Sequence, residues 1–86
     1  MQDVMITAEQ LRAARSTLGW SVAELSLRSG VGTATIKRYE AVKGLPKSRK
    51  DNLGLLKHTF EAAGIEFIGT PDDAPGIRIH SARPEG

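Results

Sequence analysis

Helix-capping residues and glycines divide the N-terminal two thirds of this chain into short segments. The positions of these start and stop signals constrain the fold more than any other feature. Thr7, with Gln10 three residues later, forms a capping-box pattern that starts a helix. Gly19 supplies the left-handed residue that commonly ends one. Apolar residues recur between them at intervals of three and four, so the pattern predicts a helix over residues 8–18.

A second short helix follows after three residues. Ser21 and Glu24 repeat the capping-box pattern, and Gly30 is the matching stop signal. These residues predict a helix over 22–29. The turn between the first two helices is therefore tight, which limits how far apart they can lie.

Two further helices are predicted beyond residue 32. Thr33 is suited to cap a third helix over 33–42. A loop containing Pro46 must follow, because proline disfavours helical backbone in the residue before it. Apolar residues then repeat at helical spacing and predict a fourth helix over 49–63.

The spacing of apolar residues changes from helical to strand-like after the fourth predicted helix. Two short β-prone runs, 65–68 and 77–80, are separated by the turn-forming residues of 70–76. We therefore expect a β-hairpin over 65–80 and a flexible tail over 81–86.

Composition fits a single, mainly α domain of four to five helices over residues 6–64, with the hairpin attached. A chain of 86 residues holds one core, and four aromatic residues leave that core to aliphatic side chains. Cysteine is absent, which excludes disulfide scaffolds, thiolate zinc sites and cysteine nucleophiles. No catalytic triad, phosphate-binding glycine loop or metal-spaced cluster is present, so we expect no enzyme activity, no metal and no cofactor.

Charge is unevenly distributed along the chain. Residues 1–50 carry nine Lys and Arg against four acidic residues, whereas residues 51–86 carry three against six. Within 37–50 there are six basic residues and one acid. This asymmetry is typical of a basic surface that meets a polyanion, although a solvated loop with incidental lysines would give a similar pattern.

The second and third predicted helices, joined by a tight turn at Gly30, have the spacing of a helix-turn-helix. Many residues over about 6–64 also agree in type and spacing with one known family: Leu11-Arg12, Ala14-Arg15, Leu18-Gly19-Trp20-Ser21, Ala23-Glu24-Leu25, Gly30-Val31 and Thr35-Ile36-Lys37-Arg38-Tyr39-Glu40. The chain resembles the Cro and phage-repressor (xenobiotic-response-element) type of helix-turn-helix protein, and in particular small bacterial members in which a hairpin follows the last helix.

The resemblance implies a repressor-like fold and a sequence-specific regulator of transcription, expected to be a dimeric repressor that reads a palindromic operator of double-stranded DNA through the major groove. It implies contacts to bases from the third helix and contacts to phosphate from the following loop. The implied base-contacting residues are Thr33, Ala34, Lys37 and Arg38, and the implied phosphate-contacting residues are Ser21, Lys43, Lys47, Arg49 and Lys50. It also implies a structural ion pair between Arg15 and Glu40.

Some residues depart from the family pattern. Val22 replaces a phosphate-binding glutamine, and Gly32 replaces a serine or threonine before the third helix. With Ala34, they reduce the polar groups available to DNA and support an alternative function: an antitoxin-like or adaptor module that binds a toxin or other regulator, with DNA binding secondary. Trp20 is expected to be partly buried against the first helix, and His58 with Glu61 to form a solvated helix surface.

The predicted hairpin needs an apolar partner surface, because an isolated hairpin is marginal in water. Ile65, Phe67, Ile77 and Ile79 are the apolar residues that need cover. Packing on the helices of the same chain is one solution, and a homodimer interface is the preferred hypothesis, since two half-sites require a two-fold axis. The sequence has no membrane-length apolar stretch and no export signal, so we expect a cytoplasmic protein associated with the bacterial nucleoid.

Overall fold

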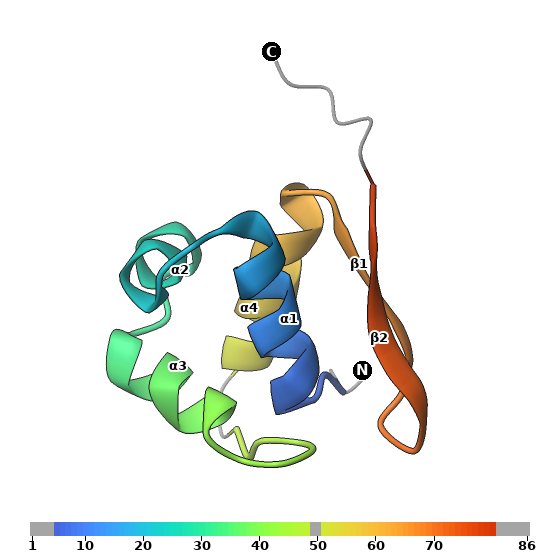
Figure 1. Cartoon of the computed structure of the whole chain (residues 1–86). Coiled ribbons are helices and arrows are strands. Elements are labelled where there is room, and N and C mark those ends of the chain that lie inside the picture. Colours follow the sequence, from blue (N-terminus) through green and yellow to red (C-terminus); the bar gives the residue numbers. More distant parts are fainter. Residues whose placement is uncertain (1–4, 49–50, 81–86) are drawn as a thin grey trace.

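The chain folds as four helices followed by a two-stranded antiparallel hairpin (Figure 1) in the computed structural model, which describes residues 5–48 and 51–80. The elements are α1 (Ala8–Leu18), α2 (Val22–Ser29), α3 (Thr33–Glu40), α4 (Asn52–Ala62), β1 (Ile65–Thr70) and β2 (Asp73–Ile79). Arg49, Lys50 and the expected tail over 81–86 lie outside the described residues. Within the described part, no helix has the length and apolar character needed to cross a membrane.

Local capping sets the bounds of α1 and α2, which confirms the predicted ranges 8–18 and 22–29. The Thr7 hydroxyl accepts a hydrogen bond from the Gln10 backbone N–H at 3.1 Å, and the side-chain oxygen Oε1 of Gln10 accepts one from the Thr7 backbone N–H at 2.9 Å. Gly19 ends α1 with a φ of 70°. Ser21 caps α2 by accepting from the Glu24 N–H at 2.9 Å.

The third helix is shorter than predicted, ending at Glu40 rather than at residue 42. Its N-cap is Gly32 and no side chain caps it, so the prediction that Thr33 caps this helix was wrong. The chain leaves the helix early because its next segment is bound to the start of α1. The Gly44 carbonyl accepts a hydrogen bond from the Ala8 N–H at 2.8 Å.

The fourth helix spans Asn52–Ala62, within the predicted 49–63. Its buried side chains are Leu53, Leu56 and Phe60, spaced three and four residues apart. They form the centre of a core that takes residues from all four helices and from β1. The buried hydrophobic members of that core are Ile6, Leu11, Ala14, Leu25, Val31, Ile36, Tyr39, Leu53, Leu56, Phe60 and Ile65.

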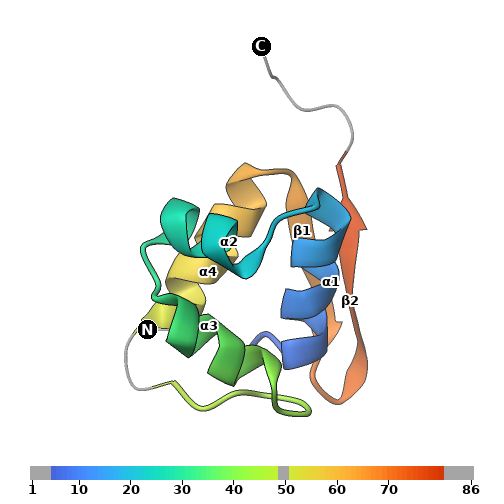
Figure 2. The same ribbon diagram turned by 60° about the vertical axis from the view of Figure 1, so that its left-hand side comes forward.

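The hairpin packs on one side of the helices. Its strand β1 contacts α4 and its strand β2 contacts α1. Helices α2 and α3 lie on the side of the molecule away from the hairpin in both views (Figure 1, Figure 2). This arrangement leaves the outer surface of α3 uncovered by any other described element.

The turn of the hairpin is shorter than predicted. Only residues 71 and 72 lie between the strands, whereas the sequence prediction assigned 70–76 to the turn. Gly76 pairs with Ile68 and Asp73 with Thr70, across an irregularity in the ladder. The strands continue through turn-forming residues because left-handed backbone at Gly69 and Ala74 absorbs this irregularity.

Three of the four apolar hairpin residues pack on their own chain. Ile65 is 2% exposed and belongs to the core, and Phe67 and Ile77 are partly buried against it. Only Ile79, 58% exposed, is left on the surface. Ile65 is thus covered by its own chain, and of the four residues expected at a dimer interface Ile79 is the most exposed.

The hairpin needs a glycine at position 69, because the backbone is left-handed there and leaves no room for a Cβ atom. Replacing Gly69 with alanine should therefore destabilise the protein by about 1–3 kcal/mol. Its φ is +77°, and an added Cβ would lie 2.2 Å from the backbone oxygen of Ala74. Urea unfolding followed by circular dichroism measures the loss. Gly76→Ala is the matched control, since its Cβ would meet only Ile68 side-chain atoms at 3.8 Å; equal stability of the two variants would contradict the prediction.

Candidate nucleic-acid interface

Helix α3 has one buried and one exposed surface. Ile36 and Tyr39 are 1% and 2% exposed and anchor the helix in the core. The four predicted base-contacting residues are all exposed: Thr33, Ala34, Lys37 and Arg38. Because residues three and four apart share a helix surface, they form one continuous surface opposite the core. It carries two cationic side chains, one hydroxyl and two methyl groups.

An ion pair between α1 and α3 fixes the end of α3. The Arg15 Nε donates to Glu40 Oε2 and its Nη2 to Oε1, both at 2.8 Å, which is the bidentate geometry that guanidinium and carboxylate groups favour. A third nitrogen of Arg15 donates to the Trp20 carbonyl at 3.0 Å. The hydrogen bond to Glu40 raises the pKa of Arg15, so the guanidinium stays charged.

Little solvent reaches this pair, since the side chains of Arg15 and Glu40 are 24% and 9% exposed. Arg12 of α1 also donates to the backbone oxygen of Glu40. Helix α1 thus binds both the side chain and the main chain at the last residue of α3. The ion pair is turned into the protein and holds α3 in place.

The loop after α3 is held at both of its ends. Near its start, the Gly44 N–H donates to the Glu9 carboxylate at 3.2 Å. Hydrogen bonds from the backbone N–H groups of Glu9 itself and of Gly44 lower the pKa of Glu9. Near its end, the Tyr39 hydroxyl donates to Ser48 Oγ at 2.8 Å and accepts from Asn52 Nδ2 at 3.3 Å. These contacts fix the path of the loop between α3 and α4.

The predicted phosphate-contacting residues lie at two places. Lys43 and Lys47 are exposed on the loop, and Ser21 is exposed at the start of α2. The Ser21 oxygen already caps α2, but its hydroxyl hydrogen can still be donated. Arg49 and Lys50, the other two predicted contacts, lie outside the described residues.

One departure from the family pattern, at Val22, has a structural counterpart. Val22 packs partly buried against the hydrophobic core, where a polar side chain would lose its hydration. The predicted capping box of α2 is only half formed: Ser21 accepts from the Glu24 N–H, but the Glu24 side chain does not bond back to Ser21. Its carboxylate instead accepts a hydrogen bond from Arg28 Nε at 2.6 Å. The start of α2 is thus less polar than the family pattern implies.

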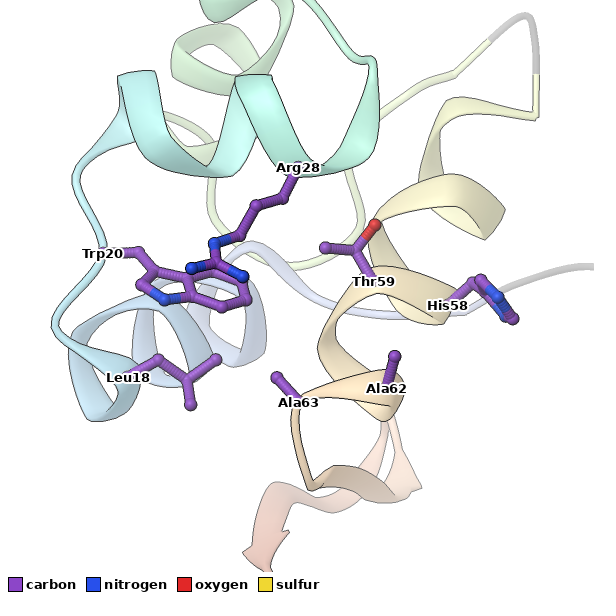
Figure 3. Close-up of a pocket in the computed structure, with 7 residues that line it drawn as sticks. All are labelled: Leu18, Trp20, Arg28, His58, Thr59, Ala62 and Ala63. Atoms are coloured by element: carbon purple, nitrogen blue, oxygen red, sulfur yellow. The ribbon is translucent and has the colours of Figure 1, made fainter. Parts of the chain in front are cut away.

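Trp20 is partly buried, as predicted, and its indole packs against the core with a direct contact to α4. Its indole stacks on Phe60 with ring centroids 5.8 Å apart and an interplanar angle of 17°. The Arg28 guanidinium carbon lies 4.4 Å from the centroid of the same indole (Figure 3). Sequence spacing cannot reveal these contacts, since Trp20 and Phe60 are 40 residues apart.

The structure gives less support to a site at His58 and Glu61 or to a metal site. Glu61 pairs with Lys57 at 2.8 Å on α4, so the carboxylate beside His58 is already engaged. No group of three or more His, Asp or Glu side chains in residues 5–48 and 51–80 could hold a metal ion. The exposed surface of α3 and the loop that follows it therefore form the best-defined candidate site.

No protein-family model and no curated protein sequence matches this chain. Its function must therefore be inferred from the exposed α3 surface, the anchoring ion pair and the basic loop.

Proposed function

We propose that this protein is a sequence-specific double-stranded DNA-binding regulator of transcription, in which α2 and α3 act as a helix-turn-helix and α3 enters the major groove. The observation that carries the proposal is the two-sided α3, with Lys37 and Arg38 exposed opposite the buried Ile36 and Tyr39. A helix held this rigidly loses little conformational entropy when it binds, which favours specific recognition.

Three exposed residues of α3 have defined chemical roles in this proposal. Arg38 can donate two parallel hydrogen bonds to the O6 and N7 atoms of guanine, a contact that discriminates by about 1–3 kcal/mol. Ala34 and the methyl group of Thr33 suit the thymine methyl group. Lys43 and Lys47 on the loop supply positive charge for the phosphates on either side of the groove.

We further propose that the protein acts as a homodimeric repressor. A single α3 reads only a few base pairs, and a two-fold axis would place two copies on half-sites about one helical turn apart. Protein bound at such a site would block access to the operator. Ile79 is the exposed hairpin residue that a second copy could cover.

Selection from random duplex DNA at two salt concentrations tests function and symmetry together. The expected result is an enriched palindrome whose half-sites are about one helical turn apart. An enriched asymmetric motif would contradict the dimer. Salt-sensitive binding without any motif would contradict sequence-specific recognition.

Arg38→Ala and Lys47→Ala are expected to affect binding in different ways. Loss of Arg38 should remove discrimination at one base pair per half-site, by roughly 10-fold or more. Loss of Lys47 should weaken binding to all sequences alike and reduce the salt slope by about 0.9 per phosphate contact. Fluorescence anisotropy on the selected site and its single-base variants measures both effects.

Lys57→Ala is the matched control for Lys47→Ala, because it removes the same charge from an exposed ion pair on α4. It should leave affinity and salt slope nearly unchanged. A uniform loss across sequences in Arg38→Ala would show that Arg38 contacts phosphate rather than bases.

A protein-binding role is the second candidate. It is favoured by the small number of polar groups near the start of α3, where Gly32 and Ala34 lack polar side chains and Val22 is turned to the core. Co-purification of a stoichiometric toxin or other regulator, together with failure of the DNA selection, would support this role over the first.

A further inference from the structure

A pocket of about 630 Å³ lies where the C-terminal ends of α1, α2 and α4 meet (Figure 3). Trp20 and Arg28 form one wall, and Ala62 and Ala63 form the wall that α4 contributes. Alanine side chains leave open space here that larger residues would fill. The volume is within the range of small-molecule sites, roughly 300–1,000 Å³.

The aromatic wall of this pocket is held in a fixed orientation. The Trp20 indole stacks on Phe60, which is 0% exposed and also contacts Phe67 edge-on at a centroid distance of 5.9 Å. With the Arg28 guanidinium over the same ring, the orientation of the indole is already fixed before a ligand enters the pocket, and this lowers the entropic cost of binding.

Arg28 is the polar group best placed to anchor a ligand. Its Nε donates to Glu24, which fixes the guanidinium plane over the indole. Its two terminal nitrogens make no hydrogen bond within the described segments 5–48 and 51–80, and the side chain is half exposed. Guanidinium groups bind a second carboxylate through these nitrogens in a parallel, two-bond geometry.

The other polar groups of the pocket narrow the class of ligand. The Thr59 hydroxyl donates to the Leu55 carbonyl at 2.8 Å and is not free to donate to a ligand. The His58 ring turns away from Trp20 and Arg28 at the rim (Figure 3). Arg28 is thus the main anion anchor, and the neighbouring Glu24 carboxylate disfavours a doubly charged group. The site suits a single negative charge.

We propose that this pocket binds a small aromatic carboxylate, with its ring between the indole of Trp20 and the alanine wall of α4 and its carboxylate on the terminal nitrogens of Arg28. The proposal is independent of DNA binding, because it uses none of the residues assigned to the DNA interface.

Titration of the intact ¹⁵N-labelled protein with benzoate tests this site directly. Trp20 is the only tryptophan in the chain, so its indole N–H gives a single, self-assigned signal. Benzoate should shift that signal saturably. Benzamide, which has the same ring and no charge, should bind at least about 10-fold more weakly, since a charge-assisted hydrogen bond is lost. Inorganic phosphate at equal concentration should not saturate the site.

Two variants test separately how the Arg28 guanidinium and the open space beside Ala62 contribute to benzoate binding. Arg28→Gln should weaken benzoate binding at least about 10-fold, whereas Arg78→Gln, which removes an exposed arginine that is also paired with a glutamate, should leave it unchanged. Ala62→Leu should weaken binding by filling the space while retaining Arg28. Equal affinity of Arg28→Gln and the unmodified protein, or a shift that never saturates, would overturn the proposal. No DNA is present, so this failure would leave the proposed function intact.

Discussion

Replacing Phe60 with alanine should lower the free energy of unfolding by about 3–5 kcal/mol, the largest effect expected of any single substitution in this chain. The Phe60 side chain is 0% exposed and contacts the rings of both Trp20 and Phe67. Its removal opens a cavity where α4, the end of α1 and the hairpin meet. A domain of this size has roughly 5–10 kcal/mol of stability, so about a third or more would be lost.

Thermal unfolding followed by far-ultraviolet circular dichroism measures this effect. At about 4–8 °C per kcal/mol, the midpoint should fall by roughly 12–40 °C. Leu55→Ala is the control on the same helix, because Leu55 is 45% exposed and its loss opens no cavity. A change for Phe60→Ala as small as that of the control would show that the three rings do not form the centre of the core.

Replacing Gln10 with alanine should cost about 2–4 kcal/mol, an unusually large effect for a polar residue of a helix. Gln10 is 4% exposed, and its side-chain oxygen Oε1 caps the Thr7 N–H. Its amide nitrogen donates to the backbone oxygens of Ile68 at 3.1 Å and Gly76 at 2.8 Å, on the two strands of the hairpin. One side chain therefore satisfies groups on three segments of the chain.

The variant Gln10→Glu separates the stability that comes from the hydrogen bond to Thr7 from the stability that comes from the hydrogen bonds to the hairpin. Glutamate keeps the acceptor for Thr7 but has no donor, and its charge would face two carbonyl oxygens. We expect urea unfolding to show Gln10→Glu at least as unstable as Gln10→Ala. A Gln10→Glu protein as stable as the original would show that the hairpin contacts contribute nothing.

These two residues connect the halves of the molecule. Phe60 packs on the start of the α2 segment through Trp20 and on β1 through Phe67, and Gln10 binds α1 to both strands. The hairpin is thus part of the same folding unit as the helices. Weakening either contact should also weaken DNA binding indirectly, by lowering the population of molecules in which α3 is held for recognition.

Much of the helical framework could be predicted because its signals are local. Thr7, Gly19 and Gly30 act through hydrogen bonds to residues within five positions along the chain, or through the left-handed backbone of one residue. The ranges of α1 and α2 therefore agree with the prediction. The exposed surface of α3 could also be predicted from nearby residues. Helical periodicity alone places Lys37 and Arg38 on the side of the helix opposite Ile36 and Tyr39.

The parts that could not be predicted depend on distant segments. The end of α3 is set by the bond between Gly44 and Ala8, and the two-residue turn of the hairpin by pairing of residues that are turn formers in isolation. No residue near Trp20 in the sequence indicates that its indole stacks on Phe60. Each of these choices follows from the free energy of the whole packed arrangement, in which loop closure is offset by burial elsewhere.

The sequence alone determined where α1 and α2 begin and end, that the chain changes from helix to hairpin near residue 64, and that its positive charge gathers between residues 37 and 50. Tertiary structure decided that the hairpin packs on its own helices, that Gln10 joins it to α1, and that Trp20 and Arg28 line a pocket against α4. The physical reason is the range of the interactions. Helix caps and helical periodicity depend on residues a few positions apart, whereas core contacts depend on how all the apolar surfaces of the chain pack together.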